Sequence, residues 1–299
     1  MCGIVGLFLK TPGLEAKLGE LVGPMLVSLT DRGPDSTGFA VYGKGAKGKT
    51  KLTLRGRSGE DFAKIATTLG RSLREKLKIV DHDTHAVISV PADKVDAACG
   101  KLAEIAPEVS VVSVGARMEL YKEVGLPREV ASRFDLSKMS GTHAIGHTRM
   151  ATESAVTTNG AHPFSTGIDQ CLVHNGSLSN HNAVRRELQR DGLSFRTDND
   201  TEVAAGYLTW KMRQGLDLKA ALSSALKDLD GFYTFVVGTE SGFAVLRDPI
   251  ACKPAVMVET DAYVAFGTEY RALADLPGVE KGHVFEPEPA KVYVWERAQ

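Results

Sequence analysis

The apolar run at the start of the chain, Cys2-Gly-Ile-Val-Gly-Leu-Phe-Leu9, constrains the fold more than any other stretch. It is too short, and too poor in flanking basic residues, to be a signal peptide or a membrane span. The run predicts a buried strand. Its first residue, Cys2, becomes the free end of the chain once Met1 is removed.

A cysteine at the chain end carries a thiol and an α-amine on one residue. The amine titrates near pH ~8, so a large fraction is neutral at physiological pH and can accept the thiol proton. This is a known design for a covalent nucleophile. The plainer alternative is a strand that happens to begin with cysteine, and Cys2 alone does not decide between the two.

Composition narrows the classes of function. The 299 residues suffice for one large domain or two ordinary ones. Lys and Arg number 36 against 37 Asp and Glu, so the net charge of -1 gives no attraction to nucleic acid or to an anionic membrane. The four cysteines contain no C-x-x-C pair, which argues against a zinc site or a disulfide framework. No targeting segment is visible, and we expect a cytoplasmic protein.

Apolar periodicity predicts alternating strands and helices over the rest of the chain. Helices are predicted at 14–29, 60–78, 92–106, 180–190, 201–213 and 218–229. Strands are predicted at 39–42, 51–55, 84–90, 109–114, 232–237, 243–246, 255–258, 263–266 and 292–295. The segment from 59 to about 130 has a different character, because it contains a compact strand–helix–strand unit. It is either an inserted lobe or a part of the main sheet.

One stretch, Gly43-Lys-Gly-Ala-Lys-Gly-Lys-Thr50, matches the phosphate-binding pattern G-x-x-x-x-G-K-[ST] letter for letter. Such a site needs a strand entering the loop and a helix leaving it. Residues 51–55, which leave the loop, alternate as a strand does. We therefore expect a flexible basic hairpin rather than a nucleotide site.

A group of acidic and histidine residues, Asp81, His82, Asp83 and His85, lies at the start of the predicted strand 84–90. Histidine and carboxylate side chains are metal ligands. Alternating polar residues of this kind more often form a solvated turn, and that is the interpretation we favour. No metal site is predicted.

Four residues at the predicted ends of strands and helices supply what a Cys2 nucleophile would need. Asn175 and Gly176 offer an amide and a following N–H to hold an oxyanion. Arg149 is a two-pronged donor for a substrate carboxylate, and Asp200 is a partner for an ammonium group. Each has a plainer explanation: a surface ion pair for Arg149, a hairpin turn for Asn175-Gly176 and a helix cap for Asp200.

Taken together, these residues resemble the class II glutamine amidotransferases, which have an N-terminal cysteine. Met1-Cys-Gly-Ile-Val-Gly6 is similar to the start of that family. Its later landmarks have counterparts in Arg32-Gly-Pro-Asp-Ser-Thr-Gly38, Gly146-His-Thr-Arg-Met-Ala-Thr152, His174-Asn-Gly-Ser-Leu-Ser-Asn180, Asp198-Asn-Asp-Thr-Glu202, Gly231-Phe-Tyr-Thr234 and Arg247-Asp-Pro249. The motifs occur in family order, and the chain is identified as a member with one amidotransferase domain over 2–299.

The resemblance implies an α+β fold of the N-terminal-nucleophile (Ntn) hydrolase type. This is a four-layer αββα sandwich, here with an inserted α/β segment at about 59–130. The resemblance also implies that Cys2 is the nucleophile, with its own amine as base. Asn175 and Gly176 would form the oxyanion hole.

The resemblance further implies a glutamine site. Arg149 would bind the glutamine carboxylate and Asp200 its amine. Thr152 and Arg32 would complete the site, Arg32 by ordering the surroundings of the nucleophile. The loop Arg32–Gly38, with glycines at both ends and a proline inside, is expected to be mobile and to close over the substrate.

Within the family, the chain most resembles the separate amidotransferase subunit of glutamate-synthase-like complexes, including N-methylglutamate synthase (methylamine–glutamate N-methyltransferase). This implies that it hydrolyses glutamine and passes ammonia to synthase subunits. No cofactor is expected on this chain, and a flavin is expected on a partner subunit. Two alternatives stay open: a hydrolase of another γ-glutamyl amide, and a non-catalytic assembly subunit.

Overall fold

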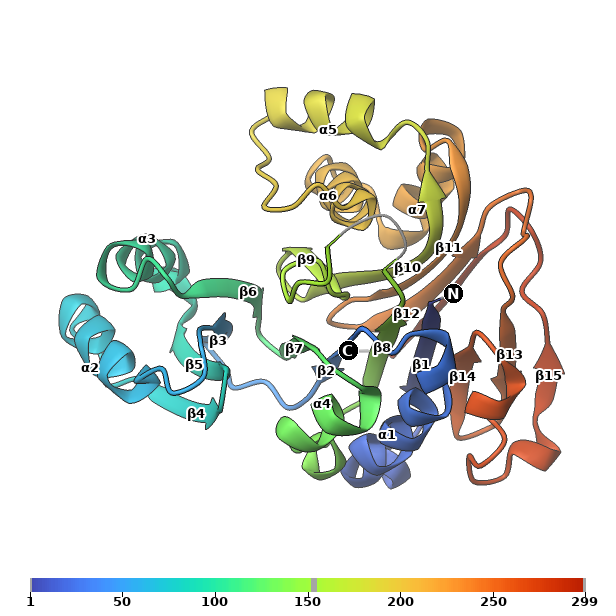
Figure 1. Ribbon diagram of the computed structural model, residues 1–299, viewed down its shortest axis with the longest axis horizontal. Coiled ribbons are helices and arrows are strands. Elements are labelled where there is room, and N and C mark those ends of the chain that lie inside the picture. Colours follow the sequence, from blue (N-terminus) through green and yellow to red (C-terminus); the bar gives the residue numbers. More distant parts are fainter. Residues whose placement is uncertain (1, 152–154, 298–299) are drawn as a thin grey trace.

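The fold is described from a computed structural model that covers residues 2–151 and 155–297. Two sheets stacked face to face form the body, and a smaller third sheet lies to one side (Figure 1). The seven-stranded sheet has the order β15 (His283–Phe285), β13 (Val256–Glu259), β14 (Tyr263–Gly267), β1 (Gly3–Leu9), β8 (His143–Arg149), β2 (Ser36–Tyr42) and β7 (Met118–Val124). The five-stranded sheet has the order β16 (Val292–Glu296), β12 (Gly242–Arg247), β11 (Gly231–Gly238), β10 (Gln170–Leu178) and β9 (Phe164–Gly167).

Strand β1 lies inside the seven-stranded sheet, antiparallel to both β14 and β8. Its residues are all buried because both of its faces are covered. Ile4 and Phe8 face the second sheet, whereas Val5 and Leu7 face a helical layer. Side chains of a strand alternate between its faces, so a strand covered on both sides is apolar at every position. This explains the unbroken apolar run at the start of the sequence.

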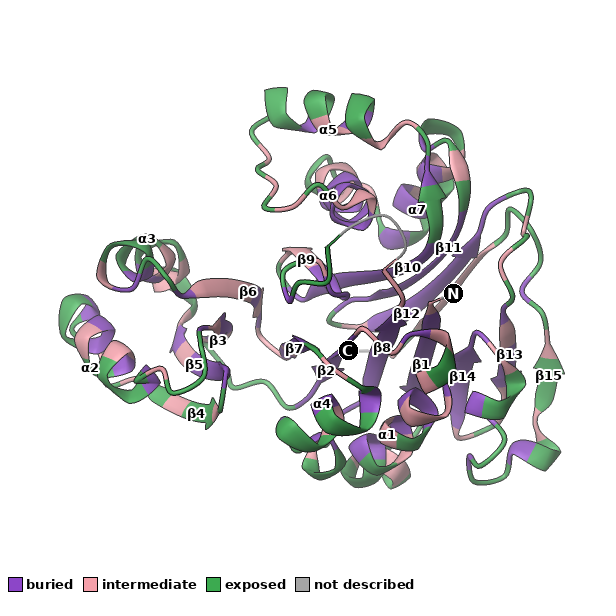
Figure 2. Cartoon of the chain, viewed as in Figure 1, coloured by how far each residue is buried: buried purple, intermediate pink, exposed green. Residues whose placement is uncertain are grey.

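Helices cover both outer faces of the sandwich. Helices α1 (Leu18–Ser28) and α4 (Pro127–Arg133) pack on the seven-stranded sheet, and α5 (His181–Arg190), α6 (Asp200–Arg213) and α7 (Leu218–Asp228) pack on the five-stranded sheet. Figure 2 shows the buried residues concentrated in the sheets and on the inner faces of the helices. The layer order αββα confirms the predicted α+β sandwich. Short 3-10 helices lie at Pro12–Lys17, Thr30–Arg32, Ala92–Lys94, Leu136–Lys138, Tyr270–Ala272 and Val279–Lys281.

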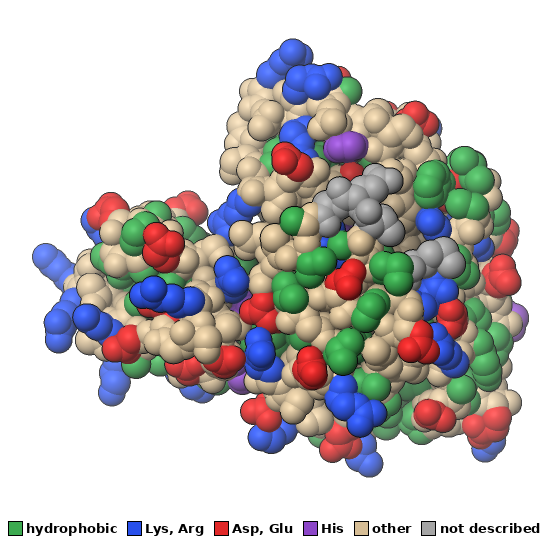
Figure 3. Space-filling view, in the orientation of Figure 1, with side chains coloured by type: hydrophobic (Ala, Val, Ile, Leu, Met, Phe, Trp, Pro, Cys, Tyr) green, Lys and Arg blue, Asp and Glu red, His purple; other side chains and the backbone are tan. Residues whose placement is uncertain are grey.

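The third sheet forms a separate lobe with its own core. Its elements follow the order β3 (Lys49–Arg55), α2 (Phe62–Leu73), β4 (Lys78–His82), β5 (His85–Pro91), α3 (Val95–Ile105) and β6 (Ser110–Gly115). The sheet order is β4-β5-β3-β6, with every neighbouring pair antiparallel. This is the split β-α-β arrangement found in ferredoxin-like domains. Basic and acidic side chains are interspersed over the visible face of the lobe (Figure 3).

The lobe is bounded differently from the segment 59–130 marked in the sequence. It begins earlier, at β3, and ends at β6, whereas β7 and α4 belong to the body. The difference arises because strand pairing decides which sheet a strand joins, and local periodicity does not reveal pairing partners.

Two motifs near the lobe have structural roles. Residues 43–48 form a loop that is followed by strand β3 and not by a helix, so the phosphate-binding arrangement is not formed. In the acidic-histidine group, the expected turn is limited to Asp83 and Thr84, because Asp81 and His82 lie in β4. His85 is buried and its ring packs on Phe134 at 4.8 Å.

No helix within residues 2–151 and 155–297 has the length and apolar character needed to cross a membrane.

Packing between the two large sheets is expected to dominate stability. Phe243 on β12 is fully buried there, and a Cβ added to Gly6 on the facing sheet would lie 2.5 Å from its ring. Phe243→Ala should lower the free energy of unfolding by about 3–5 kcal/mol, because it opens a cavity in a closely packed layer. Phe232→Ala is the control, since Phe232 is 37% exposed; it should cost less than about 1 kcal/mol. Urea unfolding checks both, and equal small losses would contradict the packing described.

Candidate active site

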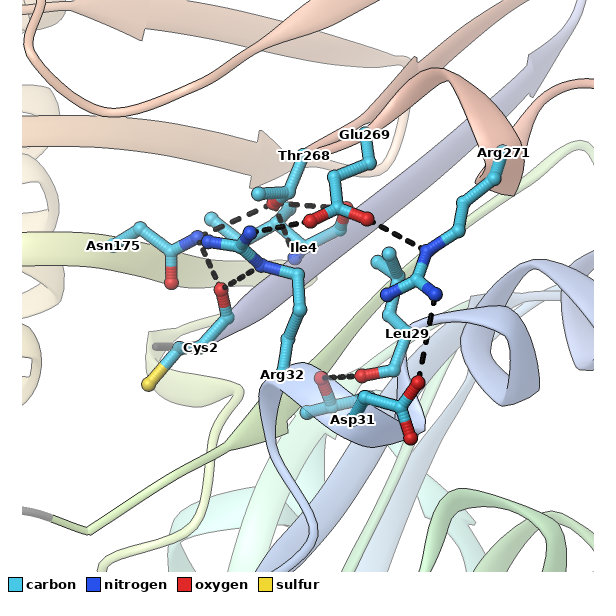
Figure 4. A network of polar contacts seen from close by, with 10 residues as sticks. Cys2, Ile4, Leu29, Asp31, Arg32, Asn175, Thr268, Glu269 and Arg271 are labelled. Carbon is cyan, nitrogen blue, oxygen red and sulfur yellow. Dashed lines mark hydrogen bonds and ion pairs between the residues drawn. The ribbon is translucent and has the colours of Figure 1, made fainter.

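The carbonyl oxygen of Cys2, just before β1, is the point where two polar side chains meet. Arg32 donates to it from Nε at 3.1 Å, and Asn175 donates from Nδ2 at 3.2 Å. Figure 4 shows the two side chains approaching this carbonyl from opposite sides. The Cys2 thiol is half-buried, with Sγ 3.7 Å from the carbonyl oxygen of Met150. The backbone of Cys2 is therefore fixed while its thiol lies next to the end of β8.

Arg32 is held by a chain of ion pairs. Its Nη1 lies 2.5 Å from Glu269, and Glu269 in turn lies 2.6 Å from Arg271. Arg271 continues to Asp31 at 3.6 Å. Burial would raise the pKa of Glu269, but the hydrogen bond from Arg32 and the two positive charges lower it overall. Glu269 is therefore ionised at neutral pH and orients Arg32 toward Cys2.

Asn175 and Gly176 lie inside strand β10, paired with Thr234 and Tyr233 of β11. The strand continues to Leu178, so the alternative of a hairpin turn at Asn175-Gly176 is wrong. Gly176 has φ +139°, and a Cβ there would lie 1.9 Å from the Phe232 carbonyl oxygen. Only glycine fits this position without strain.

The Asn175 side chain is 7% exposed. Besides the Cys2 carbonyl, its Nδ2 contacts the hydroxyl of Thr268 at 3.3 Å. Its Oδ1 is buried, and the interaction of the Asn175 side chain with His147 partly offsets the lowering of the His147 pKa by burial. The orientation of the amide is fixed by Cys2, because a carbonyl oxygen accepts hydrogen bonds and cannot donate them.

Arg149 is the last residue of β8 and is 6% exposed, which rules out the alternative of a surface ion pair. Its Nη1 lies 3.5 Å from the Ala155 carbonyl oxygen. Asp35 fixes the backbone at this strand end, because its N–H donates to the Arg149 carbonyl at 3.0 Å and its carboxylate accepts from Ala151 N at 2.8 Å. Thr152, predicted as a further substrate residue, lies outside the described residues.

Asp200 begins helix α6, directly beside strand β10. Its Oδ2 accepts from Leu178 N at 3.0 Å, and its Oδ1 lies 3.7 Å from His174 Nδ1. Burial would raise the pKa of Asp200, but the contacts with His174 and Leu178 lower it to about 2. The N-cap of α6 is Asn199, whose side chain accepts a hydrogen bond from Thr201 N. The alternative that Asp200 is the helix cap is therefore wrong, because the residue before it has that role.

Three buried histidines lie behind these residues. The ring centroids of His147 and His162 lie 4.0 Å apart with the rings tilted by 31°, and Thr201 Oγ1 bridges His162 and His174 at 3.2 and 3.0 Å. Burial lowers the pKa of His147 to about 3 and that of His162 well below its usual range. A general base works best with a pKa near the operating pH. His147 and His162 are therefore poorly suited to take the Cys2 proton.

The segment Arg32–Gly38 packs against the body of the fold, and its mobility stays a prediction. Strand β2 already begins at Ser36, and its residues are buried. A Cβ on Gly33 would lie 2.3 Å from the backbone of Thr148, and one on Gly38 would lie 2.1 Å from a carbonyl oxygen. The two glycines therefore allow close backbone packing in this arrangement.

The structure thus brings most of the predicted residues to one end of the sandwich. Cys2, Arg32 and Asn175 are in direct contact, with Gly176 next in the strand. Arg149 is joined to Cys2 through the adjacent Met150 carbonyl, and Asp200 is joined to strand β10.

Sequence reasoning missed Thr268, Glu269 and Arg271, which follow strand β14. It also missed the histidines as a group, although two of them lie in motifs that were noted. No cluster of His, Cys, Asp or Glu side chains able to hold a metal ion occurs among the residues that the structure describes.

The depressed pKa of Asp200 has a consequence for stability. Its folded value, about 2, lies below the ordinary value of 3.8, so its contribution is present above pH 3.8 and is lost as the pH falls toward 2. Between pH 5 and pH 3 we expect the wild type to lose about 1 kcal/mol of unfolding free energy that Asp200→Asn does not lose. Urea unfolding at the two pH values tests this. Asp198→Asn, at an exposed position of the same segment, should keep the wild-type dependence; identical pH dependence in wild type and Asp200→Asn would contradict it.

Comparison with known proteins agrees with this arrangement. A family model described as a glutamine amidotransferase domain matches residues 147–275. The chain is 59% identical over 297 residues to the glutamine amidotransferase-like protein GlxB of Rhizobium meliloti (strain 1021), covering 99% of this chain and 98% of that protein. It is 32% identical over 315 residues to a putative glutamine amidotransferase of Methanothermobacter thermautotrophicus, covering 98% and 99% of the two chains.

Among solved structures, the fold is similar to that of the glutamine phosphoribosylpyrophosphate amidotransferase from B. subtilis, with a TM-score of 0.62 and 21% identity. The similarity covers 99% of this chain but only 47% of that one, so the chain spans about half of the solved protein. The extent of the match to GlxB, together with this shared fold, decides the family. The chain belongs to the class II glutamine amidotransferases.

Proposed function

We propose that this chain is the glutaminase subunit of a glutamate-synthase-like complex, of which N-methylglutamate synthase is the example its sequence resembles. The observation that carries the proposal is the contact between Asn175 and Cys2. It places a buried amide donor beside the residue that becomes the chain end. A donor in that place suits an oxyanion formed on an acyl group attached to Cys2.

The proposed reaction begins after removal of Met1, which frees the α-amine of Cys2. The amine takes the thiol proton, and the thiolate attacks the side-chain amide carbon of glutamine. Asn175 and Gly176 hold the resulting oxyanion. The C–N bond then breaks, ammonia leaves with the proton returned by the amine, and water hydrolyses the thioester to glutamate.

Two features support the choice of the amine as base. Burial lowers the pKa of His147 to about 3, although the interaction with the Asn175 side chain partly offsets this lowering. Among the residues that the structure describes, Cys2 accepts hydrogen bonds from the side chains of Arg32 and Asn175 and lies against the Met150 carbonyl, and none of these contacts is to a carboxylate base.

The charges of the site suit an α-amino acid. Asp200 has a pKa of about 2 and is ionised at neutral pH, so it can pair with the substrate ammonium. Arg149, buried at the end of β8, provides the guanidinium for the carboxylate. Thr152 and Arg32 are proposed to complete the site, Arg32 by holding the Cys2 carbonyl.

The nitrogen acceptor, with its flavin, is proposed to lie on a partner subunit. Support comes from the match along nearly the whole length of a glutamine amidotransferase-like protein, GlxB. The sequence likeness to the separate subunits of glutamate-synthase-like complexes points the same way. Ammonia made by this chain would then be consumed by the partner.

Replacing the nucleophile tests the chemistry. Cys2→Ala should lower glutamine hydrolysis more than about 1,000-fold, because thiol and base belong to one residue and nothing replaces the thiol. Cys252→Ala is the matched control, since Cys252 is an exposed cysteine outside the site; it should keep the wild-type rate. Glutamate release is measured together with the N-terminal mass of each protein. Wild-type turnover by Cys2→Ala would overturn the mechanism.

The partner role has its own test. We expect the chain to hydrolyse glutamine about tenfold faster in complex with the synthase subunits that co-purify from its native host, because coupling prevents loss of ammonia to solvent. Tenfold corresponds to about 1.4 kcal/mol of barrier lowering. Cys2→Ala should co-purify with the same subunits and serves as the control. If the lone chain is equally active on glutamine, or more active on another γ-glutamyl amide, it is a free hydrolase and the partner proposal fails.

A further inference from the structure

Thr268 is the residue that follows strand β14, and its hydroxyl makes three hydrogen bonds. Oγ1 accepts from Ile4 N at 2.8 Å and from Asn175 Nδ2 at 3.3 Å, and it donates to Ile4 O at 3.4 Å. A hydroxyl has one donor and two acceptor sites, so the hydrogen-bonding capacity of Thr268 is filled. The side chain is 2% exposed. Its three contacts are therefore not exchanged with water.

These contacts connect segments that are far apart in the sequence. Ile4 belongs to β1 and is two residues from Cys2, whereas Asn175 belongs to β10 in the facing sheet. Backbone pairing between β1 and β14 continues one step further through Thr268 N, which donates to Ile4 O at 3.0 Å. Figure 4 shows Thr268 between Ile4 and Asn175. One hydroxyl thus sets the distance between the start of β1 and the Asn175 amide.

The amide of Asn175 has two anchors, and Thr268 is one of them. Nδ2 contacts the Cys2 carbonyl at 3.2 Å and the Thr268 hydroxyl at 3.3 Å. His147 also interacts with the Asn175 side chain, and this interaction partly offsets the lowering of the His147 pKa by burial. Without Thr268, a single hydrogen bond would hold the amide nitrogen. An oxyanion donor must be in place before the charge develops, since reorganisation during the reaction removes much of its benefit.

We propose that Thr268 is a positioning residue for the oxyanion hole, fixing the Asn175 amide in register with the nucleophile strand. The adjacent Glu269 has a parallel role toward the other donor, because it holds Arg32 against the same Cys2 carbonyl. This inference rests on the proposed function, in which Asn175 is the oxyanion donor. It assigns a role to the segment after β14, which lies beyond the last of the family motifs, Arg247-Asp-Pro249.

Thr268→Val keeps the shape of the side chain and removes its hydrogen bonds, whereas Thr268→Ser keeps the hydroxyl. The control is Thr234→Val: Thr234 lies opposite Asn175 on β11, is 1% exposed, and its hydroxyl has no partner among the described residues. The first measurement is hydrogen exchange of the Asn175 side-chain amide in protein carrying ¹⁵N-asparagine. Its signal is assigned by its absence in Asn175→Ala. The second measurement is kcat and KM for glutamine hydrolysis.

In Thr268→Val we expect the Asn175 amide protons to exchange at least about tenfold faster, and kcat to fall about tenfold with KM within about twofold of wild type. Thr268→Ser and Thr234→Val should stay close to wild type in both measurements. A purely structural role would instead raise KM or lower the amount of folded protein, and would not lower kcat while KM stays the same. If Thr268→Val shows no folded thermal transition, Thr268→Cys, a weaker hydrogen-bonding group, replaces it in the same comparison.

The two proposals fail in different ways. Unchanged exchange of the Asn175 amide in Thr268→Val, or an equal effect in Thr234→Val, would overturn the positioning role. If the wild type turns over no glutamine while the exchange of Asn175 still depends on Thr268, the positioning role holds and the proposed function fails.

Discussion

The fold brings Arg32 and Asn175 to a single oxygen atom, the carbonyl of Cys2, and the site depends on that meeting. Arg32 comes from the segment leading into β2 of the seven-stranded sheet, and Asn175 comes from β10 of the facing sheet. Two donors on one acceptor fix the backbone of Cys2 in both sheets at once. Because Arg32 is charged, its bond is the stronger type of contact. Glu269 and Thr268 hold the two donors in place from the same end of β14.

The buried titratable side chains next to Cys2 differ in the direction in which the protein shifts their charge state. His147 and His162 are buried without an opposite charge in contact, and burial lowers their pKa values so that they are neutral at physiological pH. Asp200 is also largely buried, yet its pKa is lowered, because Leu178 N and His174 contact its carboxylate. Burial disfavours charge in each case, and only the group with hydrogen-bond donors keeps it. A negative charge is therefore kept at the start of α6.

The lobe is attached to the body close to these elements. The carboxylate of Asp169, just before β10, accepts hydrogen bonds from Ala116 N, Arg117 N and Met118 N, at 2.6, 2.9 and 2.9 Å. These are the residues that connect β6 of the lobe to β7 of the body. A carboxylate with three backbone donors is a strong restraint. The junction is therefore an ordered connection, and the lobe contributes its own core without interrupting the sandwich.

The sequence by itself determined much of the order of strands and helices, although β4, β7, α4, β9 and β15 were not predicted. It also determined the buried start of the chain and the identity of Cys2, Asn175, Gly176, Arg149 and Asp200 as site candidates. Periodicity and motif order are local properties, which is why these predictions needed no knowledge of pairing. Only the tertiary structure decided that 32–38 packs against the body, that the lobe begins at β3, and that Thr268 and Glu269 lie close to Cys2. Those features depend on contacts between residues far apart in the sequence, such as Gly33 with Thr148 and Ile4 with Thr268. Such contacts arise from sheet pairing, for which the local sequence carries no signal.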